Sequence, residues 1–234
     1  DDYVELVLRR GADRPAFLAE RSRRPLDEAE QVTALRWLEA QRSSMLMYTS
    51  CGWFFNDLSG IETLQVLRYA GRLVDQLADL SVDDVEVPFL ERLAEAESNL
   101  SVTGADLYRG EVLTRRVHDQ SLAAHVALTH LVEPRPVEGV VAGRRYRISH
   151  HEAVRRGRWT LGTFRVQLQE VTTGAKTDHA ACALHLGGVE LHCVLRSYPG
   201  DDAFAQARER IMSAMAQSSL LQLLRTADDE LGPD

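Results

Sequence analysis

The first 133 residues carry apolar side chains at helical spacing. Asp27 and Glu30 have the pattern of a capping box, and after them the apolar positions recur every three or four residues. The predicted apolar face consists of Val32, Leu35, Leu38, Met45 and Leu46. The pattern predicts a helix that begins at Asp27 and ends near Gly52, a glycine in the position of a C-terminal cap.

Further helices are predicted along the same half of the chain. Ser59 and Glu62 have the S-x-x-E spacing of a second capping box. They precede an apolar face made of Ile61, Leu64, Leu67, Leu73, Val74 and Leu77. A third helix is predicted from Pro88 to Asn99, and a fourth helical region from about residue 105 to 131 with a break near Asp119.

The hydrophobic pattern changes to a period of two after Pro134 and Pro136. Arginines alternate with apolar residues over 145–148, and strand-like runs continue over 159–168. Gly162 interrupts these runs and is predicted to form a bulge. The pattern therefore predicts antiparallel strands in the second half of the chain.

The clearest strand pair runs from Ala180 to Leu195, with Gly187 and Gly188 as its two-residue turn. This register pairs Leu186 with Val189, and it separates a core face from a polar face. The predicted core face holds Leu184, Leu186, Val189, Leu191 and Cys193, and the polar face holds His185, Glu190 and His192.

The order of the predicted elements defines an α+β fold. Residues 1–133 are assigned to an N-terminal helical bundle with an aromatic loop at 49–60. Residues 134–234 are assigned to an antiparallel β-sheet or sandwich-like part that ends in a C-terminal helix. This last helix is predicted from Asp201 onward.

Composition and charge narrow the class of protein. The 234 residues carry a formal net charge of −8 without a basic block, so no nucleic-acid partner is predicted. Three cysteines without a C-x-x-C pair favour neither a disulfide framework nor a structural zinc site. We expect a cytoplasmic protein without a membrane partner, because no signal peptide and no apolar run of about 18 residues is recognisable. No phosphate-binding loop or dinucleotide fingerprint occurs, and no cofactor is predicted.

The segment from Thr49 to Gly60 has the side chains of a sugar-binding surface. Trp53 begins a run of three aromatic residues, and Asn56 and Asp57 follow it directly. Sugar sites combine flat apolar rings with amides and carboxylates that bind hydroxyl groups. The alternative is structural: the rings close the end of the bundle, Asp57 and Ser59 cap a helix, and Glu62 completes the capping box.

Two other groups of polar residues are candidates. Gln65, Arg68 and Arg72 have helical spacing and extend a polar face along the second helix, which is either a ligand-binding or a solvated face. His185, Glu190 and His192 have the chemistry of a divalent metal site. An exposed polar face of a hairpin explains these three residues better, and no metal site is predicted.

The sequence around this segment is similar to a known family. The run from Arg36 to Arg42 leads into MLMYTSCGWFFNDLSGIE at 45–62 and QVLRYA at 65–70. Weaker agreement is found in FLERLAEAESN at 89–99 and LHLGG at 184–188. These stretches resemble domain-of-unknown-function family 3536, the C-terminal region of family-57-like glycoside hydrolases of the α-amylase/α-mannosidase-like type. The resemblance covers most of the chain.

The resemblance implies a function and a set of residues. It implies that the chain follows a catalytic barrel of the same polypeptide, lines the cleft for an α-glucan-like carbohydrate, and lacks the catalytic carboxylate pair, which lies on the barrel. Substrate-binding roles are carried over to Trp53, Asn56, Asp57, Glu62, Gln65 and Arg68. The start at Asp1 without Met agrees with a piece of a larger protein. A non-catalytic carbohydrate- or protein-binding module is the alternative, and a homodimer of the excised domain is expected if its barrel-facing surface is apolar.

Overall fold

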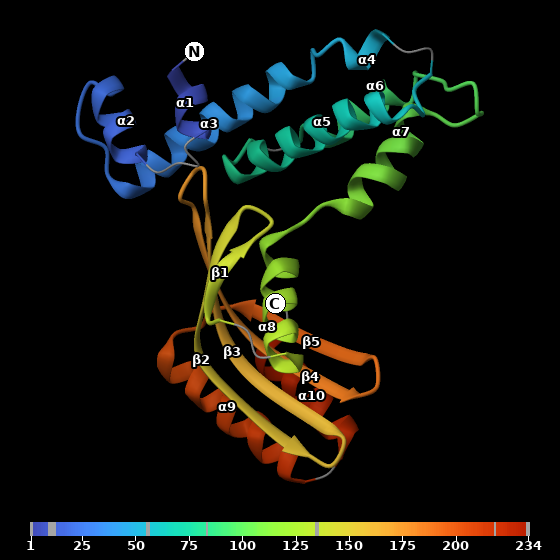
Figure 1. Cartoon of the computed structure of the whole chain (residues 1–234). Coiled ribbons are helices and arrows are strands. Elements are labelled where there is room, and N and C mark those ends of the chain that lie inside the picture. The colour runs from blue at the N-terminus through green and yellow to red at the C-terminus, as the bar shows by residue number, and fades with distance from the viewer. Residues whose placement is uncertain are drawn as a thin grey trace. The chain divides into compact units, whose positions relative to one another are not determined.

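The chain forms two compact units, Asp1–Arg116 and Val117–Asp234. The computed structural model describes residues 2–8, 13–54, 57–82, 84–133, 136–217 and 219–232. The first unit is helical and the second contains a five-stranded antiparallel sheet, so the predicted α+β class is confirmed (Figure 1). Residues 117–133, predicted at the end of the helical part, belong to the same compact unit as the sheet.

The first unit is built around two long helices, α3 (Glu28–Leu46) and α5 (Ile61–Asp79), which pack along each other (Figure 1). The predicted capping box of α3 is confirmed, because Glu30 N–H donates to Asp27 Oδ1 at 2.9 Å and Asp27 N–H donates to Glu30 Oε2 at 3.1 Å. The other elements are α1 (Asp2–Leu8), α2 (Arg14–Arg21), α4 (Cys51–Phe54), α6 (Glu86–Leu93), α7 (Gly104–Leu107), a π-helical turn (Tyr108–Val112) and a 3₁₀ turn (Leu113–Arg115). No sequence pattern predicted α2.

Among the described residues of the first unit, Glu39 is a carboxylate buried in the core. Leu6, Leu18 and Leu35 form one apolar cluster, and Leu67, Tyr108 and Val112 form another. The side chain of Glu39 is 1% exposed and accepts hydrogen bonds from Tyr3 Oη at 2.6 Å and Arg42 Nε at 3.1 Å. These charge-assisted hydrogen bonds offset the cost of burying the carboxylate inside α3.

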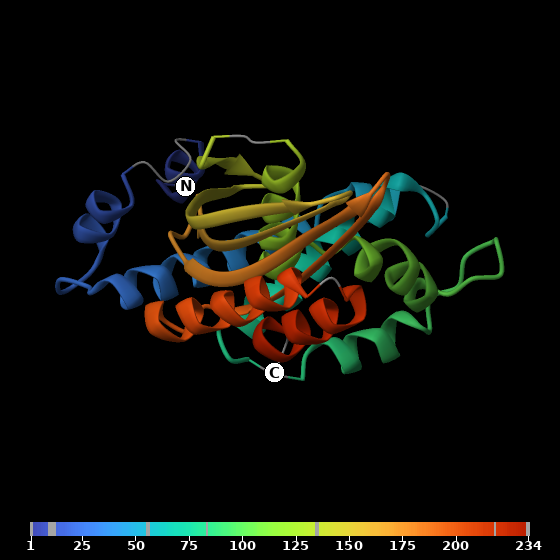
Figure 2. The same ribbon diagram turned by 90° about the horizontal axis from the view of Figure 1, so that it is seen from below.

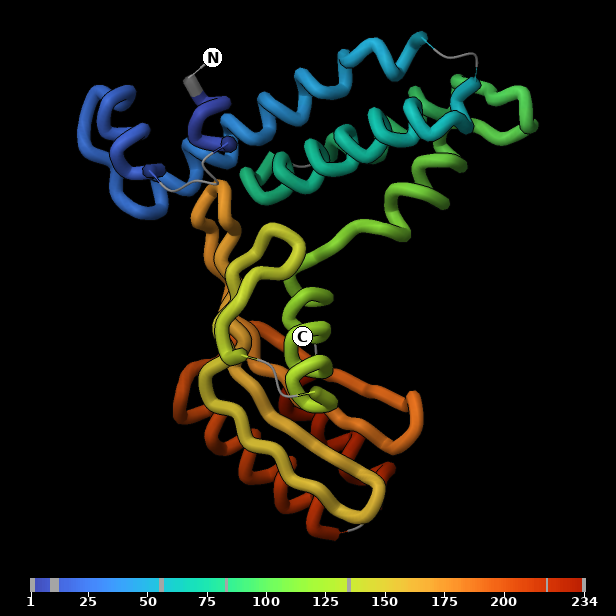
Figure 3. Tube along the Cα trace, viewed as in Figure 1, coloured from blue at the N-terminus to red at the C-terminus, as the bar shows by residue number. Residues whose placement is uncertain are grey.

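The second unit is a meander of five strands in the order β1-β2-β3-β4-β5, each antiparallel to the next (Figure 3). The strands are β1 (Glu138–Val141), β2 (Arg144–Arg156), β3 (Trp159–Glu170), β4 (Lys176–Gly187) and β5 (Glu190–Ser197). Helix α8 (Asp119–Val132) precedes them, and α9 (Asp201–Ala216) and α10 (Leu220–Leu231) follow. No described helix combines the length and the apolar character that crossing a membrane requires.

Helices cover both faces of the sheet (Figure 2). One face, here called the α8 face, packs Phe164 and Val166 against Leu122 and Val126. The other, the α9 face, packs its strands against α9 and α10. Strand β4 is buried on both faces and carries small residues that let helices approach closely, namely Ala180, Ala181, Cys182 and Ala183.

The bulge predicted at Gly162 is wrong, because Gly162 pairs regularly with Ala153 and Ala183. The register instead shifts in β2 between Ser149 and His151. A Cβ atom added at Gly162 would lie 2.6 Å from the Phe164 ring and 2.8 Å from Leu131 of α8. The glycine is therefore needed to make room for the α8 face of the core.

The predicted register of the β4–β5 hairpin is wrong by one position. Gly187 pairs with Glu190, a second shift follows between His185 and Gly187, and Leu184 then pairs with His192. A slip of one residue exchanges the two faces of a strand. Leu184 therefore lies on the α9 face and Cys193 on the α8 face, while Val189 and Leu191, predicted in the core, are 95% and 48% exposed.

We predict that Gly162→Ala destabilises the protein by about 1–3 kcal/mol, the usual cost of inserting an extra carbon into a packed core. Urea unfolding measures this loss of the free energy of unfolding. Gly110→Ala is the matched control, because a Cβ atom at Gly110 meets nothing within 4 Å. Equal stability of the two variants would contradict the packing role of Gly162.

Candidate functional site

Five large apolar side chains are exposed on the segment that joins α3 to α5 and on the helix ends beside it. Tyr48, Trp53 and Phe54 are 83%, 73% and 68% exposed, and Met45 and Ile61 are 69% and 71% exposed. We call these five residues the exposed link. Met45 and Ile61 were predicted on buried helix faces, and that prediction is wrong. The exposure of Trp53 excludes the alternative in which this ring closes the interior of the bundle.

Helix α4, which carries Trp53 and Phe54, packs closely on α5 at a glycine. Gly52 lies inside the short helix α4, and a Cβ atom added there would be 3.2 Å from Val66 Cγ2. Its predicted role as a C-terminal cap of α3 is wrong, because α3 ends at Leu46 and Gly52 does not have the positive φ of such a cap. The lack of a side chain instead lets α4 pack directly on α5.

The Asp57 carboxylate is bound by two segments of the first unit. Oδ1 accepts hydrogen bonds from Ser59 N at 2.8 Å, Ser59 Oγ at 2.6 Å and Ser98 Oγ at 2.8 Å, and Oδ2 accepts one from Asn99 N at 2.7 Å. These donors stabilise the ionised form, led by Ser59, and hold the pKa of Asp57 well below its usual range. The carboxylate therefore ties the start of α5 to residues 98–99.

Two helices differ from their predictions where their residues bind Asp57. The capping box of Ser59 and Glu62 is wrong: Ser59 donates its hydroxyl to Asp57, and α5 begins after Gly60 without a side-chain cap. The helix predicted from Pro88 to Asn99 ends at Leu93, because the chain turns back through a bridge between Glu97 and Thr103. That turn presents the Asn99 amide to Asp57.

The three remaining predicted residues of α5 are polar and half-buried. Glu62, Gln65 and Arg68 form no hydrogen bond or ion pair with the described part of the chain. All three lie on α5, the helix on which α4 packs. Arg72, the next polar residue of this predicted face, has its Nη2 atom 3.7 Å from Oε2 of the buried Glu39. Asn56 lies outside the described residues.

The histidines of the β4–β5 hairpin do not form a metal site. The observed register places His185 opposite Leu191 on the α8 face and His192 opposite Leu184 on the α9 face. The shared face predicted for His185, Glu190 and His192 is therefore wrong. In the described ranges, no group of three histidine, cysteine or acidic side chains has the arrangement of a metal site.

The fold and the link define an α+β protein with a helical unit that displays aromatic side chains and a sheet unit covered by helices. The chain belongs to the family described as "Domain of unknown function (DUF3536)", whose model matches residues 1–234. No curated protein and no solved structure matches the chain.

We predict that the Asp57 carboxylate stabilises the first unit in a pH-dependent manner. Its pKa is lowered in the folded state, so its contribution is fully present above the unfolded value of about 3.9 and is lost as the pH falls below it. Asp57→Asn should therefore be less stable than the unchanged chain at pH 7, and the difference should shrink between about pH 4 and pH 2. Urea unfolding across this range measures the difference, and a gap that does not depend on pH would contradict the assignment.

Proposed function

We propose that this chain is the non-barrel C-terminal domain of a family-57-like glycoside hydrolase, in which the exposed link lines the glycan cleft and the domain supports the catalytic barrel. The observation that carries the proposal is the exposure of Tyr48, Trp53 and Phe54 on a segment whose base is fixed by Asp57. Exposed rings such as those of Tyr48 and Trp53 have the flat apolar faces that stack on the C–H faces of pyranose sugars.

Polar groups for the sugar hydroxyls are present on α5. Gln65 supplies an amide, Arg68 a guanidinium and Glu62 a carboxylate, all on the helix against which α4 packs. The resemblance of the sequence to family-57-like hydrolases gives the substrate class, an α-glucan-like carbohydrate, and the partner, the N-terminal barrel of the same polypeptide.

In this proposal the chain binds the substrate but does not catalyse. A retaining glycosidase needs two carboxyl groups about 5 Å apart, one of them a general acid with a raised pKa. The hydrogen bonds of Asp57 lower its pKa and occupy both of its oxygens. Asp57 is therefore a positioning residue for the exposed link, and the catalytic pair is assigned to the barrel.

A non-catalytic carbohydrate- or protein-binding module is the second candidate. Met45 and Ile61 favour a protein partner, because these exposed aliphatic side chains suit an apolar interface better than a sugar. If the isolated domain forms a homodimer, a second copy of the chain is the partner that covers Met45 and Ile61.

We predict that Trp53→Ala weakens the binding of maltohexaose by up to about tenfold, the equivalent of the ~0.5–1.5 kcal/mol that stacked rings contribute. Calorimetric titration measures the affinity. Trp37→Ala is the control, because Trp37 is also exposed, at 49%, but lies on α3 outside the link. Absence of binding, together with self-association that Met45→Asp abolishes, would replace the glycan role with the protein-binding one.

We also predict that the isolated chain releases no reducing sugar from maltooligosaccharides, because Asp57, the acidic residue of the segment 49–60, is engaged in internal hydrogen bonds. A reducing-sugar assay tests this expectation. Robust hydrolysis that Asp57→Asn abolishes would show that the catalytic pair lies in this chain and would contradict the proposal.

A further inference from the structure

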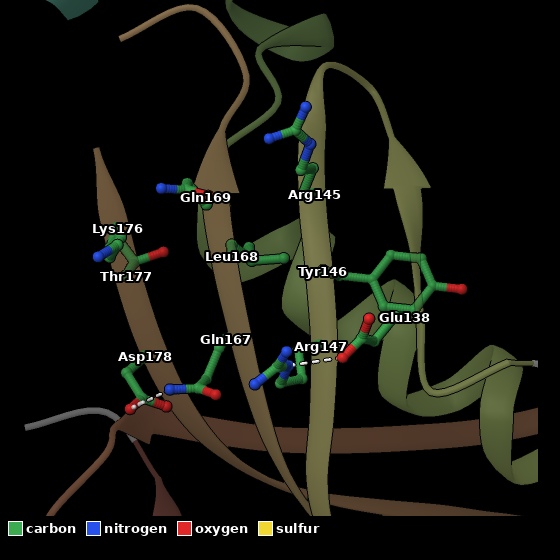
Figure 4. A pocket seen from close by; sticks show the side chains of 10 residues that line it. All are labelled: Glu138, Arg145, Tyr146, Arg147, Gln167, Leu168, Gln169, Lys176, Thr177 and Asp178. Carbon is green, nitrogen blue, oxygen red and sulfur yellow. Dashed lines mark hydrogen bonds and ion pairs between the residues drawn. The ribbon is translucent and has the colours of Figure 1, made fainter. Parts of the chain in front are cut away.

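A polar pocket lies on the part of the α9 face that belongs to β2, β3 and β4 (Figure 4). Its volume is about 540 Å³, within the range of about 300–1,000 Å³ that is typical of small-molecule sites. Side chains on three neighbouring strands form two rows across it. One row is Arg145, Gln169 and Lys176, and the other is Arg147, Gln167 and Asp178.

The acidic side chains of the pocket are already paired with arginines. Glu138 forms an ion pair with Arg147 Nε at 2.7 Å, and Asp178 accepts a hydrogen bond from Arg165 Nη2 at 2.7 Å. Arg165 does not line the pocket itself. Besides Asp178, its guanidinium pairs with Asp201 at 3.3 Å. The guanidinium carbon of Arg165 also lies 3.9 Å from the centroid of the Tyr198 ring. Neither carboxylate is paired with Arg145, which keeps its positive charge in the pocket.

Arg145 is the group that an added ligand can use. Its side chain is exposed and forms no hydrogen bond or ion pair with any residue that the structure describes. A guanidinium presents a planar fork of donors that fits phosphate and carboxylate groups in a bidentate manner. The lining holds three cationic side chains and two acidic ones, so its formal charge is positive although the chain carries a net charge of −8. Positive charge in a concave site attracts small anions.

The glutamines add a second kind of recognition. Gln167 Nε2 donates to Asp178 Oδ2 and Gln169 Nε2 to the Gly174 carbonyl, both at 3.4 Å, and these contacts leave the amide oxygens as acceptors for hydroxyl groups. Among the described residues that line the pocket, Tyr146 is the aromatic one, and its side chain lies on the α8 face of β2, so the described lining offers no ring for stacking on a neutral sugar. The combination suits an anion that also carries hydroxyl groups.

We propose that this pocket binds a small phosphorylated sugar, with Arg145 on the phosphate and the glutamines on the hydroxyls. The pocket and the exposed link belong to different compact units, so this binding is independent of the glycan-lining role proposed above.

The test is a titration of the whole chain with glucose 1-phosphate, with glucose and inorganic phosphate as separate probes. We expect glucose 1-phosphate to bind more tightly than either probe, and Arg145→Gln to weaken it by about tenfold or more, as expected for a charge-assisted hydrogen bond. Arg155→Gln is the matched control: it removes one positive charge from the same strand, but Arg155 lies on the opposite face, paired with Thr160.

Each other outcome overturns a defined part of the proposal. If glucose binds as tightly as glucose 1-phosphate, the phosphate group has no role in recognition. If inorganic phosphate binds as tightly as glucose 1-phosphate, the sugar hydroxyls have no role. Loss of binding in both arginine variants would show a general charge effect, and no binding at all would leave the pocket a solvated face of the sheet. Arg145 has no partner in the described chain, so its replacement is not expected to disturb folding, and circular dichroism of both variants checks this.

Discussion

The carboxylate of Asp57 is the constraint on which the candidate site depends. It accepts hydrogen bonds from Ser59, which follows it by two residues, and from Ser98 and Asn99, which are about forty positions further along the chain. This arrangement fixes the base of the exposed link without covering its rings. A surface that is already ordered loses less conformational entropy when it binds, and more of the contact energy then appears as affinity.

The helices were predictable wherever the sequence offered one local solution. Asp27 has no nearer partner than the Glu30 amide, and the predicted capping box forms. Ser59 has the same spacing to Glu62, but its hydroxyl donates to the Asp57 carboxylate two residues earlier in the chain. Asn99 likewise has its amide bound from a distant segment. A local pattern cannot reveal a competitor that only tertiary structure brings close.

The predicted hairpin shows how a correct pair of strands can give the wrong faces. The turn predicted at Gly187 and Gly188 is wrong by one residue, because Gly187 pairs with Glu190 and the turn consists of Gly188 and Val189. An irregularity next to Leu186 then leaves the register of the strands one residue from the predicted one. Alternation along a strand therefore predicted its existence, while the bulge decided which side chains reached the core. The same bulge places His185 and His192, two candidate metal ligands, on opposite faces of the sheet.

The polar pocket follows from a difference in length between a helix and the strands it covers. Helix α9 has 16 residues and spans about 24 Å, whereas β3 has 12 residues and extends about 40 Å. Even a helix laid along the strand leaves part of this face open, and there the alternating positions carry Arg145, Arg147, Gln167 and Gln169 instead of apolar residues. The alternation was visible in the sequence, but the pocket was not, because its position depends on where the helix starts. Asp201, in the first turn of α9, also binds Arg165, which pairs with Asp178 of the pocket. The start of α9 therefore borders the apolar core and also holds the arginine that neutralises a pocket carboxylate.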